Sequence, residues 1–142
     1  MTDYVATRWY RSPELLLMSD TLSYGKEVDI WAAGCIMGEI IDGQPLFPGE
    51  SEVDQLYCIQ KVLGALPNHL QEEFQKNPRF IGLKFPDISK PETLQKRYLG
   101  KIHKSAIDLM QKMLNMNPAN RISALDALLH PYFDDIRSDQ LN

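Results

Sequence analysis

Residues 27–41 read EVDIWAAGCIMGEII, and ten of these fifteen residues are apolar. The apolar side chains fall on nearly every face of a helix, a pattern typical of a helix that is surrounded by protein. We therefore expect a central, buried helix over residues 27–41, with the rest of the chain packed around it.

Four further helices are expected on either side of this segment. Each expected start carries a serine, and at Ser12, Ser51 and Ser123 the serine is expected to cap the helix, its side chain accepting a hydrogen bond from a first-turn backbone N–H. These helices begin at Ser12, Ser51, Ser105 and Ser123 and end at Leu17, at Gly64, before Asn117-Pro118 and before His130-Pro131. No segment shows the alternation of apolar and polar residues that is typical of a strand. The fold class is therefore expected to be mainly α.

The segment 77–104 fits none of these helices, because prolines and glycines interrupt it. A long irregular segment in a compact domain is usually functional. Its apolar side chains favour an ordered insert over a flexible linker: Phe80, Ile81, Leu83, Phe85, Tyr98 and Leu99. Between Arg79 and Lys104 there are seven basic residues and two acidic ones. Such a stretch is either a solvated surface or a docking surface for an acidic partner.

Length and composition exclude several classes of protein. The 142 residues provide for one hydrophobic core, and a net charge of −4 argues against wholesale binding of nucleic acid. The longest run without a polar side chain, residues 30–38, is far shorter than the roughly 20 residues that a membrane span needs. Cys35 and Cys58 lie in apolar, helix-like patterns. We therefore expect reduced thiols in an intracellular protein that binds neither membrane nor nucleic acid.

The sequence contains no complete catalytic motif of its own. No G-x-G-x-x-G or Walker-type loop occurs, so no phosphate cradle is expected. His69, His103 and His130 stand far apart from one another and from both cysteines, so no metal site is expected.

The N-terminal residues carry the most specific pattern. Residues 2–17, TDYVATRWYRSPELLL, resemble the end of a protein-kinase activation segment, with Ser-Pro-Glu in place of the common Ala-Pro-Glu. Residues 24–31 resemble the central helix of that family, and residues 117–121 and 130–133 resemble its last motifs. Asn117 stands where the family usually has aspartate.

Within the kinases, the chain is similar to the group of cyclin-dependent and MAP kinases, and most similar to its cyclin-dependent-kinase-like branch. The Thr-x-Tyr pair, the Trp-Tyr-Arg triplet and Pro45-Leu46-Phe47-Pro48-Gly49 carry the first similarity. Thr-Asp-Tyr together with Asp42-Gly43-Gln44-Pro45 carries the second.

The resemblance implies a partial kinase domain over residues 1–133, formed as a C-terminal helical lobe, and a C-terminal tail over residues 134–142. It implies a parent protein that is a proline-directed serine/threonine kinase using ATP and Mg²⁺. The Gly-rich loop, the catalytic-loop Asp and Asn, and the Asp that holds magnesium are not in this sequence. We therefore expect this chain alone to bind no cofactor and to be inactive. The alternative is a half-kinase that works as a non-catalytic interaction module.

The resemblance also assigns roles to residues near the N-terminus. Thr2 and Tyr4 match the sites phosphorylated by an upstream activating kinase, and Arg8 matches the partner of the phosphotyrosine. The alternative is that Thr2 and Tyr4 are simply exposed hydroxyls. Thr7 matches the residue that contacts the catalytic Asp.

Three further residues complete the expected site. In the family, the residue matched by Arg11 turns a backbone carbonyl, here near Ala6, away from the substrate. Substrates with Ser/Thr-Pro are then preferred, because proline has no N–H that needs this acceptor. Asp29 matches the residue that holds the catalytic loop. Glu14 and Arg121 match a buried ion pair of the family.

Overall fold

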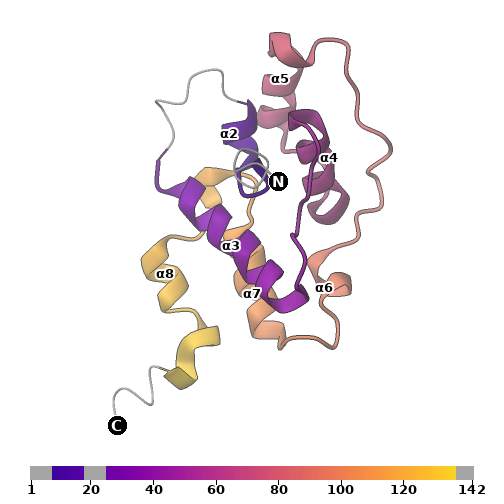
Figure 1. Cartoon of the computed structure of the whole chain (residues 1–142). Helices are drawn as coiled ribbons and strands as arrows, with labels where there is room; N and C mark the ends of the chain where they lie inside the picture. The colour runs from indigo at the N-terminus through magenta and orange to yellow at the C-terminus, as the bar shows by residue number, and fades with distance from the viewer. Residues whose placement is uncertain (1–7, 18–24, 137–142) are drawn as a thin grey trace.

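The computed structural model describes residues 8–17 and 25–136, and within them the chain forms helices and no strand. The predicted fold class, mainly α, is therefore confirmed (Figure 1). The helices are α2 (Pro13–Leu17), α3 (Glu27–Asp42), α4 (Glu52–Leu63), α5 (Asn68–Lys76), α6 (Leu94–Arg97), α7 (Lys104–Met113) and α8 (Ala124–Leu128). Three short 3₁₀ turns join them: η2 (Pro78–Phe80), η3 (Pro118–Asn120) and η4 (Pro131–Phe133).

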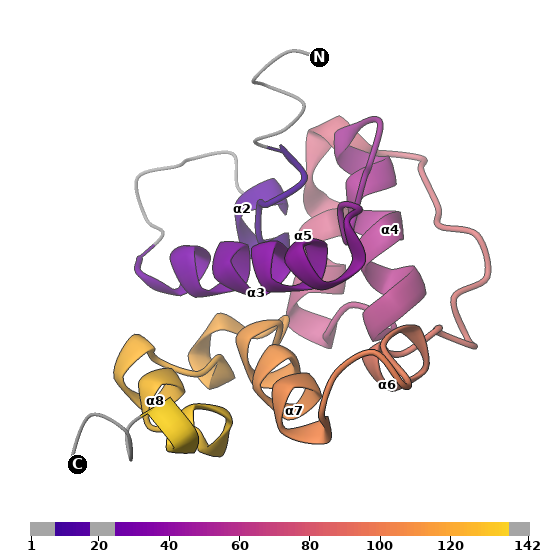
Figure 2. The same cartoon turned by 60° about the horizontal axis from the view of Figure 1, so that its bottom comes forward.

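Helix α3 is the central element, as expected. It packs against α7, and Figure 2 shows it between α2 on one side and α7 on the other. Trp31 of α3 is fully buried and stacks on Phe47, with the ring centroids 5.9 Å apart. Gly38 lets the Tyr98 and Met110 side chains lie close to the backbone of α3, because a Cβ at this position would overlap the Tyr98 hydroxyl and lie 3.1 Å from Met110 Cε.

One side of α3 differs from the expectation of a helix enclosed by protein. Ile36 is 47% exposed and Ile40 is 78% exposed. Together with Ile102, Tyr132 and other apolar residues, they line an open groove of about 580 Å³. Among the described residues, α3 is therefore covered on the side of Trp31 and Cys35, whereas its apolar side chains Ile36 and Ile40 remain exposed.

Two of the three predicted serine caps are present. Ser51 Oγ accepts the N–H of Asp54 at 3.1 Å, and Ser123 Oγ accepts the N–H of Asp126 at 3.1 Å. The helix expected from Ser105 is α7, which begins at Lys104, and its cap is His103, whose Nδ1 accepts the Ser105 N–H at 3.1 Å.

The predicted Ser12 cap is wrong, although α2 begins at the expected place. The Ser12 carbonyl accepts the N–H of Leu16 at 3.0 Å, as expected at the start of a helix. Its hydroxyl, however, is buried and has no hydrogen-bond partner in the part of the chain that the structure describes.

The insert 77–104 is ordered, as predicted, but it is not wholly irregular. It contains η2 and α6, and its Phe80, Leu94 and Tyr98 side chains are buried. Its backbone is tied to the end of α4, since the N–H of Glu92 donates to the Lys61 carbonyl at 2.7 Å.

Helix α5, just before the insert, was not predicted. Only Leu70 and Phe74 of its nine residues are buried, so its sequence has too few apolar residues to show a helical period.

The two cysteines are free and buried. Burial is the main cause that raises the pKa of both the Cys35 and the Cys58 thiols, which keeps them protonated. No helix among the described residues is long and apolar enough to cross a membrane.

Candidate functional site

The candidate site is the segment Arg8–Leu17 and the helices that hold it. Of the residues predicted for this site, Thr2, Tyr4, Ala6 and Thr7 lie outside the described residues. The other five, which the structure describes, are Arg8, Arg11, Glu14, Asp29 and Arg121.

The first part of the segment is a tight turn against the core. The N–H of Arg11 donates to the Arg8 carbonyl at 3.1 Å, and the Arg8 side chain is buried. Tyr10 donates its hydroxyl hydrogen to Glu39 Oε1 of α3 at 2.5 Å. This hydrogen bond, followed by burial, raises the pKa of Tyr10 to about 12. The turn is therefore fixed to the central helix by a neutral tyrosine.

Trp9 and Gln55 fix the same turn to the start of α4. Trp9 Nε1 donates to the Gly49 carbonyl at 2.9 Å. Gln55, which is fully buried, donates from Nε2 to the Phe47 carbonyl at 2.8 Å, and its Oε1 accepts the Gly49 N–H at 3.0 Å. The Nε2 atom also lies 3.5 Å from the Trp9 carbonyl. A single amide therefore connects three backbone groups from two distant parts of the chain.

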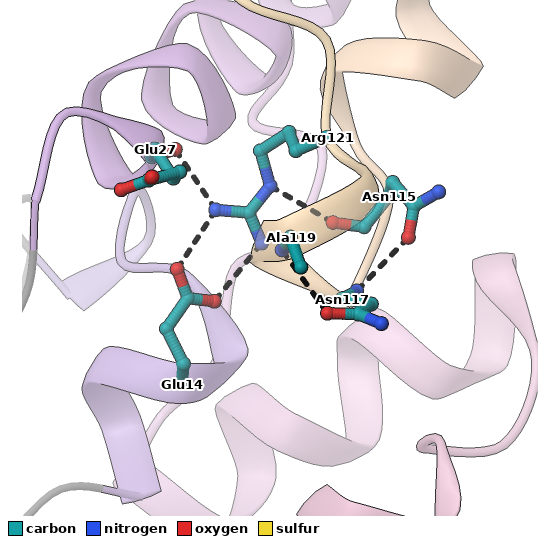
Figure 3. A network of polar contacts seen from close by, with 6 residues as sticks. All are labelled: Glu14, Glu27, Asn115, Asn117, Ala119 and Arg121. Carbon is teal, nitrogen blue, oxygen red and sulfur yellow. Dashed lines mark hydrogen bonds and ion pairs between the residues drawn. The ribbon is translucent and has the colours of Figure 1, made fainter.

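Arg121 and Glu14 form a second point of attachment (Figure 3). Arg121 Nη1 and Nη2 donate to the two Glu14 carboxylate oxygens at 2.8 and 2.9 Å. Two further N–H groups, on Nη1 and Nε, donate to the carbonyls of Glu27 and Asn115, each at 2.8 Å. The guanidinium also lies 5.2 Å from the Trp31 ring. Four of the five N–H donors of the buried cation thus have partners, and α2 is held against the start of α3.

Asn117, which stands where the family usually has aspartate, caps the 3₁₀ turn η3 beside this network. Its Oδ1 accepts the N–H of Ala119 at 3.1 Å at the start of η3. A carboxylate could accept the same bond, so the replacement leaves the local geometry possible.

The end of α2 is held by residues that the sequence did not single out. Asn77 Nδ2 donates to the Leu17 carbonyl at 2.9 Å, and Arg79 Nη2 donates to the Leu16 carbonyl at 3.0 Å. Arg79 also pairs with Glu52 at 2.6 Å. These bonds satisfy carbonyls that have no partner within a short helix.

Asp29 lies in the first turn of α3 and is exposed. Its backbone N–H donates to the Lys26 carbonyl at 3.1 Å, and its carboxylate makes no hydrogen bond with any residue that the structure describes. The side chain is therefore available to a neighbouring segment, and its assigned role stays a prediction.

The described residues do not fit an ATP–magnesium site. Nowhere among them do three His, Cys, Asp or Glu side chains lie close enough to hold a metal ion. The closest histidine–carboxylate pair, His130 and Asp108 at 2.7 Å, is structural, because His130 Nδ1 also accepts the Tyr132 N–H. What the site can do is hold an N-terminal backbone segment in a fixed position.

Comparison with known proteins gives a consistent result. Residues 1–133 match the protein kinase domain family. The chain is 55% identical to cyclin-dependent kinase-like 5 of Homo sapiens over 136 residues, which are 96% of this chain and 14% of that protein. It is 48% identical over 132 residues to cyclin-dependent kinase-like 2 of Oryctolagus cuniculus, covering 93% of this chain and 23% of that protein. It is 46% identical over 140 residues to cyclin-dependent kinase-like 4 of Homo sapiens, covering 99% and 36%. The chain thus spans well under half the length of these relatives.

Proposed function

This chain belongs to the protein kinase family, and on that premise we propose that it forms the substrate-facing part of a proline-directed serine/threonine kinase of the cyclin-dependent-kinase-like kind. The natural full-length protein would transfer the γ-phosphoryl group of ATP to Ser or Thr hydroxyls of protein substrates inside the cell.

The observation that carries this proposal is the fixed position of residues 8–11. Trp9 is bonded to Gly49, Tyr10 to Glu39, and the adjoining helix α2 to Arg121. A kinase must present the substrate hydroxyl to the phosphoryl group in a defined geometry, and a rigid platform beside the substrate supplies it.

The residues that bind ATP and Mg²⁺ would come from parts of the natural protein outside this chain. Two features of the chain support this division. The carboxylate of Asp29 is exposed at the start of α3, where it could hold the backbone of a catalytic loop. The apolar side chains of Ile36 and Ile40 lie uncovered on the same helix, and apolar patches of this kind are usually contact surfaces.

The regulation that we propose rests on Thr2 and Tyr4. An upstream activating kinase would phosphorylate both, and each phosphate would add about −1.5 to −2 charge together with oxygens that accept hydrogen bonds from arginine. Arg8, the assigned partner of the phosphotyrosine, lies in the fixed turn, so a phosphate bound there would order the preceding residues on a rigid base.

Substrate preference provides the test. The natural full-length protein, phosphorylated at Thr2 and Tyr4, should phosphorylate Ser/Thr-Pro peptides in preference to matched Ser/Thr-Ala peptides. Arg11→Met should reduce that ratio, because the carbonyl near Ala6 is then free to accept a substrate N–H. Lys112→Met, a change at an exposed ion pair on α7, is the control and should leave the ratio unchanged. Equal rates on both peptides with the wild-type protein would refute the proline-directed assignment.

A second test asks whether this chain alone binds ATP. Calorimetry on this chain alone should detect no magnesium-dependent ATP site tighter than about 1 mM. A micromolar site in this chain would contradict the proposal that the nucleotide is held elsewhere.

A further inference from the structure

The first residues of the insert bond the end of α2, the helix that directly follows the turn at residues 8–11. Asn77 Nδ2 donates to the Leu17 carbonyl at 2.9 Å, and Arg79 Nη2 donates to the Leu16 carbonyl at 3.0 Å. The bonded residues lie 60 and 63 positions apart in the sequence. Tertiary folding, and not the local chain, therefore brings the insert to this helix end.

Helix α2 depends on such partners for its position. It has five residues, whereas an isolated helix needs about 12–15 residues to be even marginally stable in water. The pair of Glu14 and Arg121 holds its first turn, and the bonds from Asn77 and Arg79 hold its end. It also packs against α5, the helix that immediately precedes Asn77 (Figure 2).

Asn77 uses both ends of its side-chain amide and is only 7% exposed. Its Oδ1 accepts the Arg79 N–H at 2.9 Å and so caps η2, while its Nδ2 donates to the Leu17 carbonyl. Its backbone N–H donates to the Glu73 carbonyl near the end of α5 at 3.1 Å. A single residue thus joins the ends of α5 and α2 to the start of η2.

Arg79 joins α2 to α4. Its Nη1 pairs with Glu52, in the first turn of α4, and its Nη2 donates to the Leu16 carbonyl. A cation is favourable at the end of a helix, because the last carbonyls carry partial negative charge. The planar guanidinium can bond both partners at once, whereas a lysine has one compact head group and lacks this fork.

A shift of α2 reaches the turn at residues 8–11 through Ser12 alone. Ser12 is fully buried, and its carbonyl accepts the Leu16 N–H at 3.0 Å, so it is no flexible joint. Trp9 and Tyr10 are bonded to other elements. Arg11, the neighbour of Ser12, is therefore the residue of the turn that a shift of α2 moves first.

We propose that Asn77 and Arg79 are positioning residues for phosphoryl transfer, because they hold α2 and, through it, Arg11 beside the substrate. The inference takes its reaction from the proposed function. The start of the insert is then part of the substrate platform. A merely structural role predicts a different result: less folded enzyme, with unchanged KM values and an unchanged preference for Ser/Thr-Pro peptides.

Asn77→Asp separates the two uses of the amide. A carboxylate still caps η2, but it places an acceptor where the Leu17 carbonyl needs a donor. In the natural full-length protein phosphorylated at Thr2 and Tyr4, this change should raise the KM for a Ser/Thr-Pro peptide at least about threefold. It should also lower the ratio of rates on Ser/Thr-Pro and Ser/Thr-Ala peptides, while the KM for ATP stays unchanged.

Asn117→Asp is the matched control. Asn117 also precedes a proline and caps a 3₁₀ turn through its Oδ1, and its side chain has no hydrogen bond to α2. This variant should keep the wild-type peptide KM and the wild-type ratio. Arg79→Lys provides a second variant that keeps the charge opposite Glu52 but loses the fork, and it should change the KM and the ratio in the same direction as Asn77→Asp.

Hydrogen–deuterium exchange, followed by mass spectrometry, reports the position of the segment without any activity. The amides of residues 8–17 should exchange faster in Asn77→Asp and Arg79→Lys than in wild type, and at the wild-type rate in Asn117→Asp. A wild-type protein without a Ser/Thr-Pro preference refutes the proposed function, and the exchange data then decide the present inference. The inference is overturned if exchange in residues 8–17 is unchanged in both variants. It is also overturned if an active enzyme keeps its peptide KM and its ratio in both.

Discussion

Arg121 donates two hydrogen bonds to the carboxylate of Glu14, a residue 107 positions away in the sequence. The Arg121 side chain is 0% exposed and the Glu14 side chain is 14% exposed, so the pair is desolvated on the cation side and nearly so on the anion side. The pair therefore joins helix α2 to the segment after α7, and the buried Arg121 guanidinium would have no access to water if Glu14 were removed.

The first prediction is that Glu14→Gln and Arg121→Met each destabilise the fold strongly. Removing one partner of a buried pair costs about 3–5 kcal/mol, whereas an exposed pair costs about 0–1 kcal/mol. Arg121→Met should cost more than Glu14→Gln, because the carbonyls of Glu27 and Asn115 also lose a donor. The measurement is urea unfolding of the natural full-length protein.

The double variant should lose clearly less than the sum of the two single losses, since neither charge is then left alone. Lys112→Met, which breaks the exposed pair with Asp108, is the control and should have little effect. Two small and additive losses would show that the Glu14–Arg121 pair contributes nothing to stability.

The second prediction concerns Tyr10. Its folded pKa of about 12 lies above its ordinary value of 10.0, so the unfolded chain releases this proton first as the pH rises. The stabilisation is complete below pH 10 and is lost progressively up to about pH 12. Glu39→Gln removes the main cause and should move the Tyr10 titration, followed by ultraviolet absorbance, towards pH 10. An unchanged titration in Glu39→Gln would show that the hydrogen bond is not the cause.

The third prediction concerns Asp42, the last residue of α3. The hydrogen bond from Lys101, with the charges of Lys101 and Arg97, holds the pKa of this carboxyl below its usual range. A lowered folded pKa gives stability that is present above the unfolded value of about 3.9 and is lost as the pH falls through the folded pKa. Lys101→Met should raise the Asp42 pKa, measured by carboxyl ¹³C NMR. Lys96→Met, a nearby lysine without an ion pair among the described residues, should leave it unchanged.

The fourth prediction concerns Gln55. Gln55→Leu preserves the approximate size of the side chain but removes both amide hydrogen bonds, so the Gly49 N–H and the Phe47 carbonyl keep only their bond to each other at 3.0 Å. The loss of the two amide hydrogen bonds should cost about 1–3 kcal/mol of unfolding free energy. Gln95→Leu, a change at an exposed glutamine, is the control for the substitution itself.

Gly49→Ala should disturb the same contact from the other side, because a Cβ at Gly49 would overlap the backbone of Gln55. The Trp9 fluorescence should change in both Gln55→Leu and Gly49→Ala, since Trp9 Nε1 bonds the Gly49 carbonyl. A spectrum and a stability equal to wild type in both variants would contradict the proposed attachment of the turn.

Local rules predicted much of the helical framework. The caps at Ser51 and Ser123 were found because the donor and the acceptor are three residues apart, a spacing visible in any sequence. The cap at His103 was missed because histidine is not among the residues that the capping rule favours. Helix α5 was missed because only Leu70 and Phe74 of its nine residues are buried, too few to show a helical period.

The candidate site was less accessible to sequence reasoning, because its contacts are long-range. The Glu14–Arg121 pairing was inferred from family resemblance, not from spacing, and the structure brings the two residues together. Gln55, Asn77 and Arg79 gave no such signal, since a buried amide and a surface amide look alike in a sequence. Asn77 and Arg79 bond the carbonyls of Leu17 and Leu16, 60 and 63 residues away, and Gln55 joins Phe47 and Gly49 to the Trp9 carbonyl 46 residues away.

The separation of Glu14 from Arg121 along the chain also bears on folding kinetics. A contact between residues 107 positions apart costs a large loss of chain entropy when it forms early in folding. We therefore expect it to be absent from a transition state that is built on contacts between nearer residues. Interactions that form after the transition state change the unfolding rate and leave the folding rate nearly unaltered. The ion pair therefore determines mainly how long the folded lobe persists once formed, and only slightly how quickly it is reached.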